Sequence, residues 1–260
     1  MAGTASAQGI RQRALSRTLV DARLRAGSLR EFPGPLPRDL DEAYAVQALS
    51  VAAWPDEVVG WKVGGIPPKH RHALGAKYVT GPIFRKRLAY THPGEVSEMP
   101  VFAEGFAAIE PEFILQMGEY REEDRLFIGA EIASSPLVAI NDIGPLAVAC
   151  DFGNNNGVLV GPEIEGWQEA GERDLPVETF IDGEMVATRI VRDLVADVLA
   201  AQSFLLEHAR QKGIVLVPGT LISTGAITGV HEAGVGAQST LRFGKFGRVD
   251  IELVAEQAKV

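Results

Sequence analysis

Apolar residues recur at helical spacing in three parts of the chain. They follow one side of residues 10–26, with Gly27 as a stop signal. A second helix is predicted from Asp39 or Asp41 to Trp54, because acidic residues suit a helix start and a proline follows. The third is predicted over residues 188–212, closed by a glycine. The first two helices would form a small N-terminal unit.

Between these helices the pattern changes to short apolar runs. Residues 58–161 alternate such runs with Gly, Pro and Asn, which is typical of strands with few helices. Three more strand-like runs follow the third helix: IVLV (214–217), LIST (221–224) and RVDIELV (248–254). This order indicates an α+β fold rather than alternating βαβ units. We expect a helical N-terminal part, residues 1–57, and a larger β-rich catalytic domain, residues 58–260.

Two glutamates in the segment IEPEFILQM (residues 109–117) are candidate metal ligands. If the segment is a strand, Glu110 and Glu112 lie on one face, because side chains alternate with a period of two. Close carboxylates repel each other, and a hard cation such as Mg²⁺ relieves the repulsion. Glu131 would supply a third oxygen ligand. The alternative is a solvent-facing acidic pair. Pro111 implies a sheet edge, a bulge, or a strand that begins only at Glu112.

Composition narrows the classes of partner. The chain has 260 residues and a net charge of −9, which argues against a nucleic-acid surface and against anionic membranes. No segment approaches 18 consecutive apolar residues, so a cytoplasmic protein is expected. The single cysteine, Cys150, lies in an apolar setting that favours a buried structural thiol over a nucleophile.

Several common catalytic motifs are missing from the sequence. There is no phosphate-binding loop of the Walker type, and the glycines of residues 60–65 lack dinucleotide-fingerprint spacing. A metalloprotease H-E-x-x-H motif, paired zinc-binding cysteines and a nucleophile elbow are also absent. These absences argue against nicotinamide chemistry, zinc hydrolysis and covalent serine catalysis.

Six ordered segments resemble one enzyme family. They are AYAVQ (43–47), GWKVG (60–64), IEPEF (109–113), GAEIA (129–133), NNNGVLVG (154–161) and ISTGAITG (222–229). Together they are similar to the 2-keto-4-pentenoate hydratase and 4-oxalocrotonate decarboxylase family, within the fumarylacetoacetase-like superfamily. The resemblance spans roughly residues 38–255. It implies a helical N-terminal part, a mostly β domain with a curved sheet around the site, and a homo-oligomer.

The resemblance also implies roles for individual residues. Glu110, Glu112 and Glu131 match the ligands of Mg²⁺ or Mn²⁺, and Lys62 matches a lysine that faces the substrate. By the same matching, the substrate-binding positions are Asn156, Thr224 and Gly225. The simpler alternatives are a surface lysine and ordinary polar turns.

The function implied is a metal-dependent lyase that acts on a short 2-oxo acid. Hydration of a 2-hydroxypenta-2,4-dienoate in aromatic-compound degradation is the first expectation. The alternatives are decarboxylation of a 2-oxo-enedioate (4-oxalocrotonate type), C–C hydrolysis of an acylpyruvate, and a catalytically silent ligand-binding relative.

Two departures from the family pattern leave the proton-transfer group unassigned. Val79 and Thr80 stand where the family often has an acid, and the segment EIASS (131–135) is unusual. Histidines are candidates for a replacement base: His70, His72, His92, His208 and His231. Residues 70–72 are expected in an exposed loop or lid.

Overall fold

The computed structural model describes residues 6–170 and 174–259. Within them the helices are α1 (Ala7–Leu24), α2 (Leu40–Ala53), α3 (Pro68–Leu74), α4 (Ile140–Ile143), α5 (Pro145–Cys150) and α6 (Leu194–Lys212). The strands are β1 (Val58–Gly65), β2 (Tyr78–Phe84), β3 (Leu88–Tyr90), β4 (Val96–Val101), β5 (Phe106–Gln116), β6 (Arg125–Ser135), β7 (Asn155–Glu163), β8 (Leu175–Ile181), β9 (Glu184–Val191), β10 (Leu221–Ser223), β11 (His231–Glu232), β12 (Gln238–Phe243) and β13 (Arg248–Ala255). The α+β class is confirmed.

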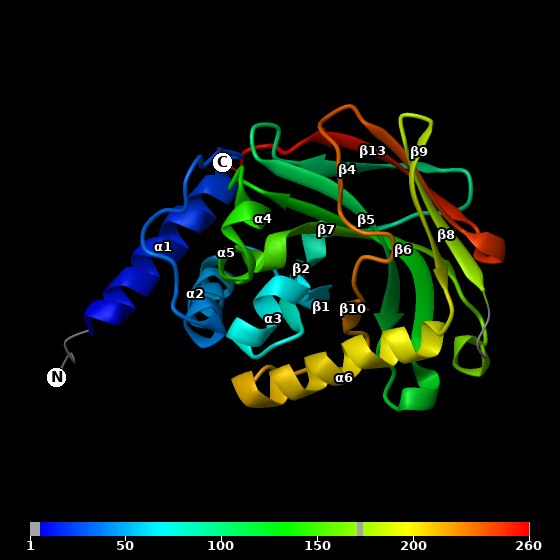
Figure 1. Ribbon diagram of the computed structural model, residues 1–260, viewed down its shortest axis with the longest axis horizontal. Coiled ribbons are helices and arrows are strands. Elements are labelled where there is room, and N and C mark those ends of the chain that lie inside the picture. The colour runs from blue at the N-terminus through cyan, green and yellow to red at the C-terminus, as the bar shows by residue number, and fades with distance from the viewer. Residues whose placement is uncertain (1–5, 171–173, 260) are drawn as a thin grey trace.

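Two sheets enclose the main core (Figure 1). Within the described residues, the larger sheet has the order β2-β1-β10-β5-β6-β7-β3, with β11 beside β5, and the smaller has the order β4-β13-β12-β8-β9. Alternate residues of β5, including Ile109 and Phe113, pack in one cluster with Leu241 and Ile251 of the smaller sheet. The intervening residues of β5, among them Glu110 and Glu112, therefore point away from this core.

The N-terminal helices form where the pattern predicted them. Ser6 caps α1 by accepting a hydrogen bond from the Gly9 amide, and Asp39 caps α2 in the same way through the Glu42 amide. Both helices pack on the larger sheet, in a cluster that includes Phe106 of β5. The division into domains at residues 57 and 58 stays a prediction.

The helix predicted over residues 188–212 begins later in the structure than expected. Strand β9 occupies residues 184–191, where it pairs with β8, and α6 begins only at Leu194. The Asp193 side chain caps α6 by accepting from the Ala196 amide at 2.8 Å. The β-branched residues Thr188, Ile190 and Val191 suit a strand better than a helix. Gly213 does end α6, with a left-handed φ of 68°.

Two shorter predictions also fail. Residues 214–217 form no strand, and the Ile214 amide bonds back to Ala209 O as part of the helix cap. Residues 70–72, expected in a loop, lie in α3, which has a proline in its first turn and a left-handed Gly75 at its end. No helix in the described part of the chain is long and apolar enough to cross a membrane.

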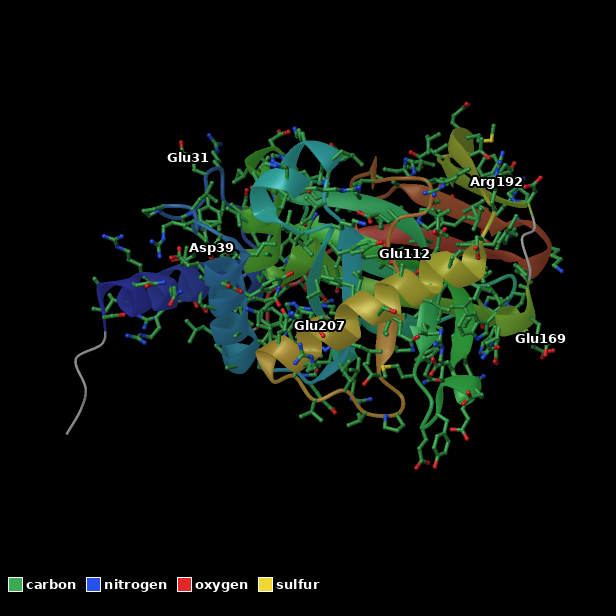
Figure 2. All side chains as sticks on the ribbon, turned by 60° about the horizontal axis from the view of Figure 1, so that its bottom comes forward. Glu31, Asp39, Glu112, Glu169, Arg192 and Glu207 are labelled. Atoms are coloured by element: carbon green, nitrogen blue, oxygen red, sulfur yellow. The ribbon has the colours of Figure 1, made fainter. Side chains whose placement is uncertain are left out.

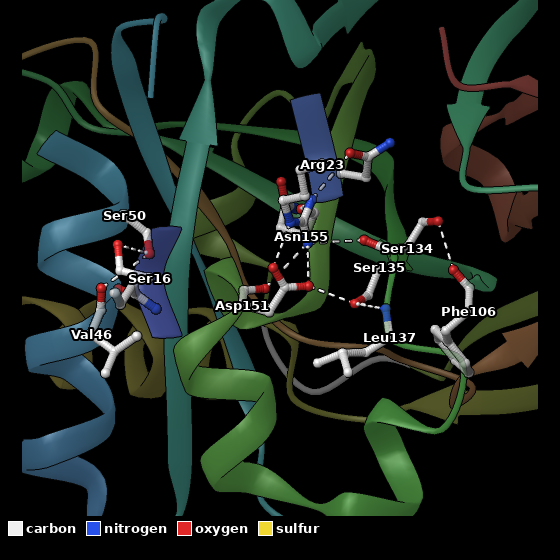
Figure 3. Close-up of polar contacts among 12 residues, drawn as sticks. Ser16, Arg23, Val46, Ser50, Phe106, Ser134, Ser135, Leu137, Asp151 and Asn155 are labelled. Carbon is white, nitrogen blue, oxygen red and sulfur yellow. Dashed lines mark hydrogen bonds and ion pairs between the residues drawn. The ribbon is translucent and has the colours of Figure 1, made fainter. Parts of the chain in front are cut away.

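Arg23 fixes α1 to the body of the protein through a buried ion pair (Figure 3). Its guanidinium contacts both carboxylate oxygens of Asp151, at 2.6 and 2.9 Å. It also donates to the carbonyl oxygens of Ser134 and Asn155, each at 3.1 Å. The Ser135 hydroxyl donates to the same aspartate. One side chain thus connects the first helix to β6 and to the start of β7.

Replacement of Arg23 by Met should lower the free energy of unfolding by about 3–5 kcal/mol, because Asp151 would stay buried without its partner. Chemical denaturation measures this loss. The control is Arg17→Met on the exposed side of α1, which should change stability by less than about 0.5 kcal/mol. Adding Asp151→Asn to Arg23→Met should restore part of the loss; no recovery would contradict the unpaired-charge explanation.

Stability should also depend on pH through His208 of α6. Burial, assisted by the Lys212 charge, lowers its pKa from the ordinary 6.5 to about 4. The unfolded chain therefore gains a proton between these values that the folded chain does not, and stability is lost as pH falls through this window. The loss between pH 7 and pH 5 should reach about 2 kcal/mol.

Denaturation at several pH values tests this expectation. His208→Gln should have a flatter pH profile than the parent, whereas His92→Gln, at an exposed position, should keep the parent's slope. Equal slopes for all three proteins would refute the assignment to His208.

Candidate active site

Three glutamates converge on one face of the larger sheet. Glu110 and Glu112 are separated by one residue of β5, and Glu131 of β6 is the register partner of Glu110. Their exposed fractions are 6%, 0% and 0%, and each offers a carboxylate oxygen within 4.8 Å of the others. Figure 2 shows Glu112 in the interior of the molecule, whereas the labelled Glu31, Glu169 and Arg192 lie at its periphery. The structure therefore has the arrangement that the strand alternation predicted, and a solvent-facing pair is ruled out.

Pro111 lies inside an unbroken strand without a bulge, at a local gap in the ladder on one side of β5. β5 begins at Phe106, and its register with β6 runs unbroken across the proline. On the other side, β11 pairs only as far as Ile109 and β10 begins to pair at Ile114. Pro111 O accepts from the Ile227 amide at 2.9 Å in the space between these strands. The backbone nitrogen of Pro111 carries no hydrogen, and at this position β5 has no neighbouring strand on that side that would need an N–H donor.

Neighbouring strands hold the carboxylates in place. Glu112 Oε2 accepts from the Ser223 hydroxyl of β10 and from the Gly225 amide, the latter at 2.9 Å. Glu131 Oε1 accepts from Asn155 Nδ2 of β7 at 3.0 Å. Glu131 Oε2 lies 3.2 Å from the ammonium of Lys62 on β1. Strands far apart in the sequence thus contribute to one buried cluster.

The cluster has an excess of negative charge. Burial, reinforced by Glu131, raises the pKa of Glu110 to about 8 and also raises that of Glu112. Burial alone would lower the pKa of Lys62, which is only 5% exposed, but the three carboxylates outweigh it and raise the pKa above its ordinary value. If all are ionised, three negative charges face one positive charge. A divalent cation would balance this difference.

Two buried carboxylate oxygens are available to such a cation. Glu112 Oε1 has no hydrogen-bond partner among the described residues, and Glu131 Oε2 has only its ion pair with Lys62. Unsatisfied buried oxygens are costly, and Mg²⁺ and Mn²⁺ prefer oxygen ligands. The donor set, the burial and the charge therefore fit a hard divalent ion.

A strained turn brings β7 into position beside the cluster. Phe152, Gly153 and Asn154 all have positive φ values, of 54°, 67° and 65°. The turn packs so closely on β2 that a Cβ on Gly81 would be 2.0 Å from Phe152 O. Side chains in this backbone region are disfavoured, and such strain is concentrated at functional sites. The turn places Asn154 and Asn155 next to the carboxylates.

A cavity of about 280 Å³ opens beside the cluster. Lys62 and Glu110 form its charged part, and Asn154 lies in its wall. The side-chain oxygen of Asn154 is buried and has no hydrogen-bond partner among the described residues. A buried acceptor of this kind is available to a ligand or a water molecule.

The substrate-binding positions expected from the resemblance have different surroundings. Asn156 donates to Pro100 O at 2.8 Å and to Glu256, and accepts from Arg23. Thr224 donates to Phe113 O at 3.0 Å, and the Gly225 amide bonds Glu112. None of these three lines the cavity, whereas Ala226 does. Their contact with substrate stays a prediction.

Neighbours of the predicted positions make the direct contacts instead. Asn155 and Ser223 bond the carboxylates, and Asn154 lines the cavity, although none of them was singled out in the sequence. The motifs NNNG and ISTG signalled the turns but not which side chain points inward. Thr80, at the position where an acid was expected, donates to Lys62 O at 2.7 Å and so supports β1.

Histidines are scarce near the cluster. None of the chain's histidines, all within the described ranges, lines the cavity. His70 of α3 comes near it, since a Cβ on the cavity-lining Gly144 would be 3.8 Å from His70 Nε2. His231 is 2.8 Å from Thr228 Oγ1, and His208 packs against Tyr44. A histidine base stays a prediction.

Solved structures resemble this one over almost the whole chain. The 4-oxalocrotonate decarboxylase from Pseudomonas putida G7, complexed with calcium and acetate, has a TM-score of 0.75 and 19% sequence identity; the match covers 96% of this chain and 100% of that one. The same enzyme complexed with magnesium and adipate gives 0.76 and 18%, covering 96% and 99%. This chain has the fold of that decarboxylase. The resemblance seen in the sequence is thus confirmed at the level of the fold.

A more distant match is the fumarylpyruvate hydrolase from Pseudomonas aeruginosa in complex with Mn²⁺ and pyruvate. Its TM-score is 0.55 at 16% identity, and the match covers 78% of this chain and 91% of that one. No protein-family model matches the sequence, and no curated protein sequence matches it. The likeness therefore concerns the shared fold.

The carboxylate cluster predicts that the purified protein binds Mn²⁺. Glu112→Gln should weaken binding by at least about 100-fold, because it replaces a charged ligand. Asn155→Ala, which removes the donor to Glu131, should weaken it by about 10–100-fold. Isothermal titration calorimetry measures both.

Glu98→Gln, at an exposed position of β4, is the matched control and should leave the affinity unchanged. If Glu98→Gln weakened binding as much as Glu112→Gln, the ion would not be bound at the cluster.

Proposed function

We propose that this chain is a divalent-metal-dependent lyase that acts on short 2-oxo acids, with Mg²⁺ or Mn²⁺ as its cofactor. The observation that carries the proposal is the buried cluster of three carboxylates beside a cavity, with two oxygens that accept no hydrogen bond. Structures with the same fold support it, since they contain calcium, magnesium or Mn²⁺ together with small carboxylic acids. Family membership and a homo-oligomeric assembly are part of the same proposal.

In this proposal Glu110, Glu112 and Glu131 hold the ion. When bound, the ion supplies a Lewis acid for the carboxylate and the 2-oxo group of the substrate. Ser223 and the Gly225 amide donate hydrogen bonds to Glu112, and Asn155 donates one to Glu131. These hydrogen bonds keep the ligands oriented.

Lys62 is the catalytic residue that the geometry favours. Its ammonium lies at the wall of the cavity and contacts Glu131. A buried ammonium there stabilises negative charge that develops on the oxygen at C2 of the substrate. Asn154, with its unpartnered amide oxygen in the same wall, accepts a hydrogen bond from a substrate hydroxyl or from the attacking water.

Hydration of a 2-hydroxy-2,4-dienoate, of the kind formed in aromatic-compound degradation, is the reaction we assign to this site. The proton of the C2 hydroxyl is lost and C5 gains a proton, which leaves a 2-oxo-3-enoate. Water then adds across the remaining double bond, with its hydroxyl at C4 and a proton at C3. Lys62 stabilises charge on the C2 oxygen in both steps, because each passes through an enolate.

Decarboxylation of a 2-oxo-enedioate is the second candidate. It is favoured by the likeness to the 4-oxalocrotonate decarboxylase over nearly all of both chains. Loss of carbon dioxide leaves an electron pair that is delocalised onto the 2-oxo oxygen, and the Lys62 ammonium would stabilise that negative charge. The two reactions share the metal and Lys62, and they differ in the substrate's distal half.

Ultraviolet spectroscopy of a panel of 2-hydroxydienoates and 2-oxo-enedioates tests this function. With Mg²⁺ the dienol absorbance should disappear, and EDTA should prevent the loss; mass spectrometry of the products separates hydration from decarboxylation. Lys62→Met should lower kcat/KM by about 1000-fold, because it removes a buried charge that acts in the transition state.

Two controls accompany the assay. Lys62→Met should keep its Mn²⁺ affinity, since the carboxylates remain, and Lys86→Met, near the exposed start of β3, should keep full activity. Unchanged spectra for every compound, in protein that binds Mn²⁺, would overturn the lyase proposal.

A further inference from the structure

The cavity beside the carboxylates has a lining of two chemical kinds. Lys62 and Glu110 are its charged residues. The other side chains in its wall are apolar or amides: Ile66, Pro67, Val79, Pro145, Val148, Ala226, Val230, Asn141 and Asn154. Glycine backbone completes the lining. Among the described residues that line this cavity, Lys62 is the single cation.

We infer that the cavity selects 2-oxo acids whose distal end is an uncharged alkyl group and rejects those with a second carboxylate there. This inference rests on the proposed function, because the ion and Lys62 would take the carboxylate and 2-oxo end. The distal half of the substrate would then lie among Val148, Ala226 and Val230. An alkyl group gains free energy from contact with these side chains.

A distal carboxylate would have no charge to pair with in this wall. Removing a carboxylate from water without a cation or a sufficient set of hydrogen-bond donors is strongly unfavourable. The amide of Asn154 can offer a carboxylate only neutral N–H donors, and its unpartnered oxygen repels one, so it does not replace a cation. Asn141 is exposed and lies at the solvent side of the cavity.

Three arginines on neighbouring elements have hydrogen-bond partners outside the cavity, and His70 of α3 lies near the cavity-lining Gly144. Arg71 of α3 donates its Nε to the Ile66 carbonyl oxygen at 2.6 Å, and its side chain is exposed. Arg189 of β9 donates to Ile227 O at 3.0 Å, and Arg23 is paired with Asp151. Arg71 is the nearest of these to the cavity wall, because Ile66 itself lines it. Arg71 and His70 are therefore the residues that a test must examine.

The inference separates this chain from a protein of the same fold. The P. putida decarboxylase was solved with adipate, which carries a carboxylate at each end. A wall without a cation at the distal end would give the opposite preference here. The hydration candidate includes substrates that end in an alkyl group, whereas a 2-oxo-enedioate has two carboxylates by definition.

Two stable compounds test the inference directly. 2-Oxohexanoate and 2-oxoadipate have the same six-carbon chain and differ in a terminal methyl or carboxylate. Titrated into Mn²⁺-loaded protein by calorimetry, 2-oxohexanoate should bind at least about 100-fold more tightly, given the cost of the unpaired carboxylate. Arg71→Gln and His70→Gln should each leave this ratio unchanged.

Installing a cation in the wall should reverse part of the preference. Val148→Arg should strengthen 2-oxoadipate binding relative to 2-oxohexanoate by at least about 10-fold, since it supplies the missing partner. Val230→Lys, at a more exposed position of the same wall, is a second variant that should fold more readily. Val215→Lys is the matched control, because Val215 is 82% exposed and does not line this cavity.

The outcomes distinguish the two proposals. Equal or tighter binding of 2-oxoadipate by the parent protein would overturn this inference and leave the proposed function standing, most clearly if Arg71→Gln abolished that binding. If neither acid bound to protein that holds Mn²⁺, the proposed function would fail and the inference with it.

Discussion

Burial of three carboxylates on one face of β5 and β6 is the constraint on which the rest of this structure depends. Charges removed from water must be paired, hydrogen-bonded or neutralised. The fold meets this requirement with the Lys62 ammonium, the Ser223 hydroxyl, the Gly225 amide and the Asn155 side chain, which come from β1, from β10 and the loop after it, and from β7. Such a cluster forms only when these strands are already in register. The carboxylate cluster can therefore assemble only when the larger sheet is correctly formed.

A second set of contacts transmits this constraint to the N-terminal helix. Arg23 of α1 bonds the backbone of Asn155, whose side chain bonds Glu131. Asp151 forms an ion pair with the same guanidinium and directly precedes the strained turn at Phe152–Asn154. A turn with three consecutive positive φ values is stable only if its surroundings hold it. Helix α1, whose described residues contribute no side chain to the carboxylate cluster, thus helps to hold the ligands in place.

Sequence analysis predicted what depends on local periodicity. Period-two alternation was sufficient to place Glu110 and Glu112 on one face, and helix caps set most of the boundaries of α1 and α2. Glu131 was expected as a ligand, but its direct pairing with Glu110 is a long-range register that no local pattern encodes. For a similar reason the sequence did not indicate that Asn155 bonds Glu131, since positive φ values in the preceding turn decide which amide faces the carboxylates. Strand β9 was missed because its pairing with β8 outweighs the helical spacing of residues 188–193.

The charged residues and most of the apolar residues of the cavity lining come from different kinds of structure. Lys62 and Glu110 are on strands held on both sides by hydrogen-bonded neighbours. Most of the distal wall, in contrast, comes from α5, from the loop that precedes α3 and from the loop between β10 and β11. Loops and short helices accept substitution more readily than central strands do. A substitution at Val148 or Val230 can therefore change which distal group the cavity accepts, while the carboxylates stay fixed. In this way one sheet can serve several reactions that share the same first chemical step.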